Sequence, residues 1–311
     1  MLIKDIKDRD QVHGIYLCKQ KTSAKTKAGK TYYSLILQDK SGTLDGKIWE
    51  LSNSIGHFES MDFICVDGDV TTFNDTLQLR ICRVRKADEG EYRQEDYFPV
   101  SPNDVEKMFE ELLSYVNSLK NPHLKKLAES FFKDDKELVK QFKQHSAAKS
   151  MHHGFVGGLL HHTLSVVKLC DGYCTLYPWL KRDLLLTAAM LHDIGKLREL
   201  SAFPINDYTD DGQLLGHIVI GYEMVGAHIA KIPGFPEKTA SELKHCILSH
   251  HGEFEYGSPK KPAIAEAVAL NFADNTDAKL EMMYEALGDS TGEWMGFHRG
   301  IDSNIRKSSE V

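Results

Sequence analysis

The spacing of apolar residues changes once along this chain, close to residue 87. Before that point apolar and polar side chains alternate in short runs, as at Leu35 and Leu37, which is the pattern of half-buried strands. From residue 101 to residue 285 the apolar spacing is helical, as at Leu184, Ala188 and Leu191. One fold class cannot satisfy both periods, so the sequence predicts a β domain followed by an all-α domain. The length of 311 residues is about that of two domains.

Residues 1–86 contain five runs of the strand type, separated by turn residues. The first run lies at residues 12–16 and the last at residues 77–82, and residues 39–42 have the composition of a turn. Five short strands in a segment of this size predict a small barrel or sandwich, and a five-stranded barrel of this size is the OB-fold.

The rest of the chain divides into four parts. Residues 87–100 have no apolar periodicity and are mostly acidic, so we interpret them as a linker. Residues 101–150 are a helical connector, whose first helix we expect to be capped by Ser101, with Pro102 in its first position and Asp104 in its first turn. Residues 151–285 form the main helical domain. Residues 286–311 are a C-terminal segment, and the last of them have the composition of a frayed tail.

Charge and composition exclude several classes of protein. The net charge of −7 means that the whole chain lacks the basic field of many nucleic-acid-binding proteins, although a local basic patch stays open. The sequence has no run of 18 apolar residues and no signal-peptide core, which argues against a membrane span and against secretion. The six cysteines form no CxxC pair, so we expect reduced thiols in a cytoplasmic protein.

Five polar positions recur within apolar stretches of the main helical domain. They are His162, the adjacent His192 and Asp193, His217, the adjacent His250 and His251, and Asp274. Each histidine alone has the alternative of being an ordinary buried residue, but ionisable groups on apolar helix faces are costly unless they are paired or bind a metal. Imidazole and carboxylate ligands suit Mn²⁺, Fe²⁺, Zn²⁺ or Co²⁺. The set therefore predicts a divalent metal site.

The adjacent pair His192 and Asp193 constrains where that site lies. Neighbouring residues on a helix point about 100° apart, so both reach one metal only near a helix end, and Gly195 is placed to supply such an end. One ion would be held by His162, His192, Asp193 and Asp274. The second oxygen of Asp193 would then bridge to an ion held by His217 and His250.

The order His, His-Asp, Asp on helices resembles the HD-domain superfamily of metal-dependent phosphohydrolases. The segments MHHGFVGGLLHHT, LHDIGK and SHHG resemble more narrowly the YhaM-type 3′→5′ exoribonucleases, in which an OB-fold precedes an HD domain. The match follows the order and spacing of nearly the whole chain. HD-type cyclic dinucleotide phosphodiesterases are less similar, because the chain lacks their Gly-Tyr-Pro motif and has Gly158 where they commonly carry a carboxylate.

This resemblance implies RNA as the substrate, a 3′→5′ direction, Mn²⁺ as the preferred metal and nucleoside 5′-monophosphates as products. Carried over by position, the core metal ligands of the family fall on His162, His192, Asp193 and Asp274, and its additional ligands fall on His217 and His250. The residues after His162 favour it over His161. His251 stays open as an alternative or additional ligand beside His250.

Other residues near the motifs are candidates for phosphate binding and proton transfer. Asp193 is expected to be catalytic through a metal-activated water. Lys196 and Arg198 are candidates to neutralise phosphate charge, although Lys196 also suits a helix C-terminus. His152 and His153 are candidates to bind phosphate or to protonate a leaving 3′-oxygen, with a solvent-facing position as the alternative.

The β domain carries a candidate binding surface for single-stranded nucleic acid. Between the first two expected strands lie five lysines with no acidic residue among them: Lys19, Lys21, Lys25, Lys27 and Lys30. OB-folds bind with this loop and one sheet face, and single strands are held by basic grooves and stacked aromatic rings. Tyr32 and Trp49 are candidates for stacking, and Arg80 for phosphate. The alternatives are a solvated loop for the lysines and packing for the rings.

Two other functions stay open from the sequence. One is an HD-type nucleotide phosphohydrolase, which would not need the OB domain. The other is a non-catalytic protein that binds nucleic acid or nucleotide. The expected partner is single-stranded RNA, with single-stranded DNA as a second candidate because no residue that reads a 2′-hydroxyl can be identified. No membrane partner is expected, and the oligomeric state, a homo-oligomer included, is left open.

Overall fold

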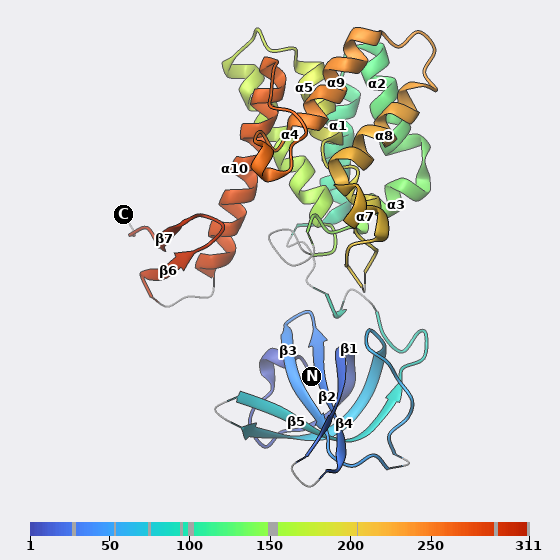
Figure 1. Cartoon of the computed structure of the whole chain (residues 1–311), viewed down its shortest axis with the longest axis vertical. Helices are drawn as coiled ribbons and strands as arrows, with labels where there is room; N and C mark the ends of the chain where they lie inside the picture. The colour runs from blue at the N-terminus through green and yellow to red at the C-terminus, as the bar shows by residue number, and fades with distance from the viewer. Residues whose placement is uncertain are drawn as a thin grey trace. The chain divides into compact units, whose positions relative to one another are not determined.

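The computed structural model describes residues 1–26, 29–52, 54–73, 76–93, 96–98, 103–148, 155–203, 205–288 and 292–309. The chain forms two compact units, Met1–Val100 and Ser101–Val311, both drawn in Figure 1. The first unit is built of strands and the second mainly of helices. Among the described residues, no helix has the length and apolar character that a membrane crossing requires.

The first unit is a closed barrel with the strand order β1-β2-β3-β5-β4. Its strands are β1 (Gln11–Lys25), β2 (Thr31–Asp39), β3 (Gly42–Ile48), β4 (Phe63–Phe73) and β5 (Thr76–Lys86), after a 3-10 helix η1 (Ile3–Asp5). β3 and β5 pair in parallel, whereas the other neighbours are antiparallel. Leu35, Leu37 and Leu79 are fully buried inside, as the strand period of two requires. The predicted five-stranded barrel is confirmed.

β1 is 15 residues long, far longer than the run at residues 12–16 that predicted it. Lys19, Lys21 and Lys25 therefore belong to a strand, and their predicted place in a loop is wrong. Pairing with β2 continues as far as Lys25, which lies opposite Thr31. The apolar pattern stops at Cys18, but backbone hydrogen bonds need no apolar side chain, so the strand continues beyond the pattern.

The segment after β5 packs against the barrel. The ring of Phe63 stacks on Tyr92 with 3.9 Å between ring centroids, and it meets Tyr97 and Phe98 edge-on. Tyr97 and Phe98 are buried, and the side-chain amide of Gln38 donates a hydrogen bond to the carbonyl oxygen of Tyr97. The described residues of this acidic segment thus add an aromatic layer to the first unit.

The second unit consists of helices around one apolar core. They are α1 (Val105–Ser118), α2 (Pro122–Glu129), a π-helix η3 (Ser130–Asp134), α3 (Lys136–Gln144), α4 (Gly158–Leu176), α5 (Arg182–Leu191), α6 (Lys196–Glu199), α7 (Asp210–Leu214), α8 (Gly216–Ile229), α9 (Glu237–Ser249), a 3-10 helix η4 (Phe254–Tyr256) and α10 (Ala265–Gly288). Leu185 of α5 and Leu270 of α10 are fully buried in this core. The predicted helical class is confirmed.

α1 begins later than predicted. Its N-cap is Asp104, whose carboxylate accepts hydrogen bonds from the backbone N–H groups of Glu106 and Lys107. The predicted cap, Ser101, and Pro102 lie outside the described residues. Asp104, which was expected in the first turn, is the cap instead, and aspartate caps helices about as well as serine.

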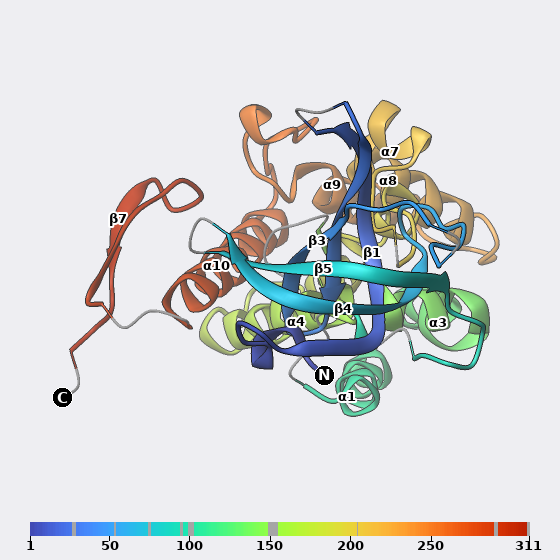
Figure 2. The same ribbon diagram turned by 90° about the horizontal axis from the view of Figure 1, so that it is seen from below.

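A β-hairpin follows α10, within the C-terminal segment whose last residues were expected to form a frayed tail. β6 (Trp294–His298) pairs antiparallel with β7 (Ser303–Arg306), so that expectation is wrong for the residues of β7. Figures 1 and 2 show the hairpin beyond the C-terminal end of α10. Ile305 is its buried side chain, whereas Trp294 and Phe297 are exposed. Strands this short carry too few apolar residues for a clear alternation.

Candidate metal centre

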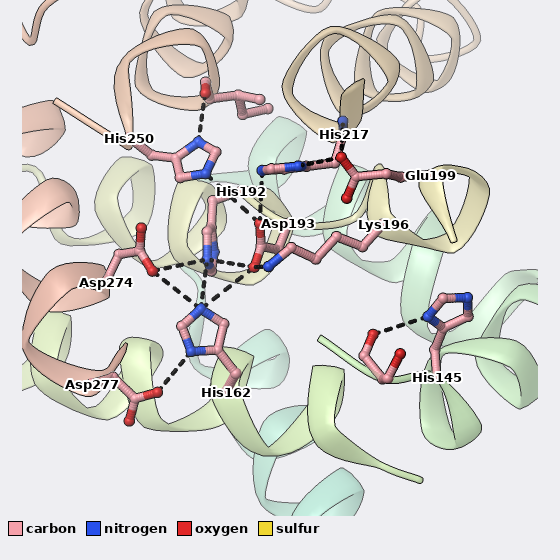
Figure 3. Close-up of polar contacts among 12 residues, drawn as sticks. His145, His162, His192, Asp193, Lys196, Glu199, His217, His250, Asp274 and Asp277 are labelled. Atoms are coloured by element: carbon pink, nitrogen blue, oxygen red, sulfur yellow. Dashed lines mark hydrogen bonds and ion pairs between the residues drawn. The ribbon is translucent and has the colours of Figure 1, made fainter. Parts of the chain in front are cut away.

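The candidate ligands meet inside the second unit, as Figure 3 shows. They are His162 on α4, His192 and Asp193 directly after α5, His217 in the first turn of α8, His250 directly after α9, and Asp274 on α10. α5 ends at Leu191, one residue before the His-Asp pair. Because the helix ends there, the neighbouring side chains of His192 and Asp193 both reach the site.

Asp193 lies between two groups of histidines (Figure 3). Its Oδ2 lies 3.4 Å from the Nε2 atoms of both His162 and His192. Its Oδ1 lies 3.5 Å from Nε2 of His217 and 3.7 Å from Nε2 of His250. One carboxylate therefore faces two sets of nitrogen ligands with its two different oxygens. This is the arrangement expected of a ligand shared by two metal ions.

The first group also contains Asp274. Its Oδ1 lies 3.2 Å from Nε2 of His162 and 3.9 Å from Nε2 of His192. The two imidazole Nε2 atoms are 3.2 Å apart. Two imidazoles and two carboxylates form a mixed nitrogen and oxygen set that suits divalent first-row metals.

The second group contains buried ligand atoms that lack a hydrogen-bond partner among the described residues. One ligand nitrogen from each of His217, His250 and His251 lies within 4.8 Å of the others. Nε2 of His217, Nε2 of His250 and Oδ1 of Asp193 are buried and have no hydrogen-bond partner within the part of the chain that the structure describes. A buried polar atom without a partner costs about 1–3 kcal/mol. A divalent metal ion would satisfy all three atoms, so the residues present fit such an ion.

Backbone carbonyl groups orient three of the histidines. Nδ1 of His192 faces Ala189, Nδ1 of His250 faces Ile247 and Nδ1 of His251 faces Tyr256, each at 2.7–2.8 Å from the carbonyl oxygen. A carbonyl oxygen only accepts, so the ring proton lies on Nδ1. The other ring nitrogen, Nε2, is then free to bind a metal.

Carboxylates orient the other two histidines, and the sequence analysis missed both. Oδ2 of Asp277 lies 2.7 Å from Nδ1 of His162. Oε1 of Glu199 lies 2.9 Å from Nδ1 of His217 and also accepts its backbone N–H. Partners of this kind fix the ring and make it a stronger ligand.

Replacing Asp277 with asparagine should weaken metal binding about 10- to 100-fold, because His162 loses its charged partner. Glu199→Gln should act in the same way through His217. Competition with a fluorescent chelator measures both affinities, and circular dichroism checks the fold. Unchanged metal affinity in both variants would contradict an orienting role for these carboxylates.

The charges of the site set its protonation. Burial alone would lower the pKa of His162, but hydrogen bonds to Asp274 and Asp277 raise it to about 10. Burial alone would raise the pKa of Asp193, but Lys196 and His192 hold it well below its usual range. Burial also lowers the pKa of His250. At pH 7 Asp193 is therefore anionic and His250 neutral, whereas His162 carries a proton that a metal must displace.

Metal binding at pH 7 should accordingly release close to one proton. Since the raised pKa of His162 keeps its proton in place below about pH 10, metal affinity should increase as the pH rises from 7 to 9. Calorimetric titration in buffers of different ionisation enthalpy counts the protons released. Binding without proton release at pH 7 would show that His162 is not a ligand.

The structure brings Lys196 to the centre but not Arg198. Nζ of Lys196 lies 2.6 Å from Oδ2 of Asp193, and this neighbour raises the pKa of the lysine although burial alone would lower it. Arg198 instead pairs with Asp211, with both side chains about half exposed. His152 and His153 lie outside the described residues, so their roles stay predictions.

A cavity of about 590 Å³ opens beside the centre. Five residues of the centre line it: His162, Asp193, Lys196, His251 and Asp274. The remaining lining residues come from the loop after α9, from α10 and from the segment before α4: Glu253, Tyr256, Asn271, Asn275, Ala278 and Ala147. The volume is in the range of sites that bind small ligands, about 300–1,000 Å³.

Comparison with known proteins agrees with this centre. The HD-domain family matches residues 159–279, a segment that runs from the start of α4 into α10. A curated protein named 3′-5′ exoribonuclease YhaM, from Geobacillus sp. (strain WCH70), is 37% identical over 284 residues, which are 89% of this chain and 85% of that protein. The chain belongs to the YhaM family.

Two solved structures are also similar to parts of the chain. The p204 HINb domain is 19% identical with a TM-score of 0.22, covering 26% of this chain and 41% of that one. The second OB-fold domain of replication protein A from Methanococcus maripaludis is 16% identical with a TM-score of 0.23, covering 30% of this chain and 98% of that one. Neither TM-score reaches the level of a shared overall fold.

In this YhaM-family chain the predicted nucleic-acid-binding residues of the barrel differ in their surroundings. The rings of Tyr32 and Trp49 stack, with centroids 4.6 Å apart. Nζ of Lys30 lies 3.7 Å from Oε1 of Glu50, the residue that follows Trp49 in the sequence. Lys21 is mostly buried, and its ammonium lies over the rings of Phe58 and Tyr33, so it is a packing residue rather than part of a binding loop.

The other described candidates of the barrel are exposed. Lys19 and Arg80 are exposed, on β1 and β5 respectively. Lys25, at the end of β1, is exposed as well. Lys27 lies outside the described residues. The stacked pair of rings is therefore the most defined feature that the structure gives to the predicted nucleic-acid surface.

Proposed function

We propose that this chain is a metal-dependent 3′→5′ exonuclease that hydrolyses single-stranded RNA to nucleoside 5′-monophosphates. The curated relative has a 3′-5′ exoribonuclease activity in its name and aligns over most of both chains. The observation that carries the proposal is the position of Asp193 between two groups of histidine Nε2 atoms. Single-stranded DNA is a second substrate to test.

The ligands divide between two ions. His162, His192, Asp193 and Asp274 would hold one, and His217, His250, His251 and the shared Asp193 would hold the other. Bound divalent ions supply a nucleophile at neutral pH by lowering the pKa of water, and they neutralise the charge on phosphoryl oxygens. We take Mn²⁺ as the preferred ion, with Fe²⁺, Co²⁺ and Zn²⁺ as others that such ligands bind.

The other residues of the site bind the substrate or orient the metal ligands. Lys196 is cationic and lines the cavity, so its ammonium is placed to bind a phosphoryl oxygen of the substrate. Asp277 and Glu199 keep His162 and His217 turned toward the centre. We assign His152 or His153 the role of giving a proton to the 3′-oxygen that leaves when the phosphodiester breaks.

A 5′-labelled single-stranded RNA tests the proposal. With Mn²⁺ it should give a descending ladder of labelled fragments and unlabelled nucleoside 5′-monophosphates, and EDTA should stop both. Intact RNA together with hydrolysis of free nucleotides would instead identify a nucleotide phosphohydrolase. Bound RNA without any product would identify a binding protein.

We also propose that the protein is cytoplasmic, because its six cysteines are free.

Trp49→Ala should weaken RNA binding about 5- to 150-fold, because stacking contributes about 1–3 kcal/mol per base. Fluorescence anisotropy of labelled RNA, measured in EDTA to prevent cleavage, gives the dissociation constant. Trp179→Ala removes an exposed tryptophan of the second unit and is the matched control. Equal affinities of the two variants would show that Trp49 does not contact RNA.

A further inference from the structure

A short loop at residues 252–257, which follows the last pair of candidate metal ligands, has a tightly held backbone. The backbone N–H of Gly252 donates to the carbonyl oxygen of Ser249 at 2.9 Å. Directly after the loop, the buried hydroxyl of Ser258 donates to the carbonyl oxygen of Leu248 at 3.0 Å. Both bonds tie the loop to the end of α9. These hydrogen bonds therefore fix the position of the backbone that carries the side chains of the loop.

One contact joins this loop to the metal centre, and a second holds the ligand His250 against α10. The carbonyl oxygen of Tyr256 accepts the Nδ1–H of His251 at 2.8 Å. The side-chain amide of Asn271 on α10 donates to the carbonyl oxygen of His250 at 2.8 Å. Gly252 has φ +81°, and a Cβ there would lie 2.5 Å from the amide nitrogen of Asn271, so this close approach requires glycine. The loop is therefore held in a fixed position beside His250 and His251.

The loop carries two exposed aromatic rings, and they differ in position. Tyr256 is 71% exposed, yet it lines the cavity together with Asp193 and Lys196. Phe254 is 59% exposed, but it is not among the residues that line the cavity, and the ammonium of Lys261 lies over its ring. A ring this exposed adds little to the apolar core. Tyr256 is thus available to a ligand in the cavity.

The geometry points to a nucleobase subsite in which the ring of Tyr256 stacks on the base of the 3′-terminal nucleotide. This inference rests on the proposed function, which places the scissile phosphate at the metal centre. Every base has a π-face, so stacking tolerates all sequences. That tolerance suits an enzyme that removes successive nucleotides from one end. Stacking on Tyr256 positions the nucleotide that is about to leave.

The test uses two RNAs that differ only in whether the 3′-terminal nucleotide carries a base. The wild type should prefer the RNA with the base by about 5- to 150-fold in kcat/KM. Tyr256→Ala should lose this preference, whereas Tyr256→Phe keeps a ring and should retain it. Phe254→Ala is the matched control and should behave as the wild type. All variants should keep their metal, since Tyr256 holds His251 through its backbone carbonyl.

A second readout does not depend on turnover. With 2-aminopurine as the terminal base, binding in EDTA should quench its fluorescence with the wild type and Phe254→Ala, but not with Tyr256→Ala. The inference is overturned if Tyr256→Ala retains the wild-type preference and quenching, or if the preference follows the penultimate base. If the wild type leaves both RNAs intact, the proposed function fails, and the fluorescence still decides whether the subsite exists.

Discussion

Asp193→Asn should reduce RNA hydrolysis by at least about 10³-fold, because a metal centre supplies several kcal/mol of transition-state stabilisation. The amide has one neutral oxygen and a nitrogen that cannot bind a metal. It therefore cannot serve both histidine groups, which lie 3.4–3.7 Å from the two carboxylate oxygens. Rates of product release from 5′-labelled RNA at saturating Mn²⁺ measure the loss.

The matched control is Asp211→Asn. Asp211 is half exposed and pairs with Arg198 away from the metal centre, so this change should alter activity less than about twofold. Metal analysis of both proteins should show that only Asp193→Asn has lost bound metal. A wild-type rate in Asp193→Asn would contradict the assignment of the shared ligand.

Gly195→Ala should destabilise the second unit by about 1–3 kcal/mol or more, as overpacking of a filled interior does. A Cβ at Gly195 would lie 2.0 Å from the carbonyl oxygen of His217 and 2.6 Å from the backbone nitrogen of Gly221. Both atoms belong to α8, so that helix must shift, and His217 shifts with it. We expect weaker metal binding in addition to a lower unfolding free energy.

Gly172→Ala provides the control for this substitution. Gly172 is exposed within α4 and a Cβ there meets nothing within 4 Å, so alanine should raise the stability by roughly 1 kcal/mol through helix propensity. Urea denaturation gives both unfolding free energies. Equal stabilities for the two alanine variants would show that α6 and α8 do not require the close approach at Gly195.

The sequence predicts the barrel well because a half-buried strand repeats every two residues, and Leu35, Leu37 and Leu79 follow that period into the core. It does not predict the second half of β1, where pairing with β2 is made by the backbone. It also does not predict β6 and β7, since Ile305 is the one buried hydrophobic residue among the described residues of the hairpin. Elements held by backbone pairing leave little apolar pattern.

The candidate ligands could be predicted because they are ionisable residues on apolar helical segments, where an unpaired charge is costly. Glu199 could not be predicted, because it lies 18 positions before His217 in the chain and only the folded structure brings the two side chains together. Asp277 left a weak signal, since it follows Asp274 by three residues and so shares its helix face. Tyr256 left none, because its position depends on loop bonds that only the structure displays.

Asp193 should be shared by two metal ions in the centre that hydrolyses RNA. The most direct test is an anomalous difference map from crystals of the full chain grown with Mn²⁺. We expect two peaks, one beside each carboxylate oxygen of Asp193, with His162 and His192 at one and His217 and His250 at the other. A single peak away from Asp193, or no peak near it, would contradict a ligand shared by two ions.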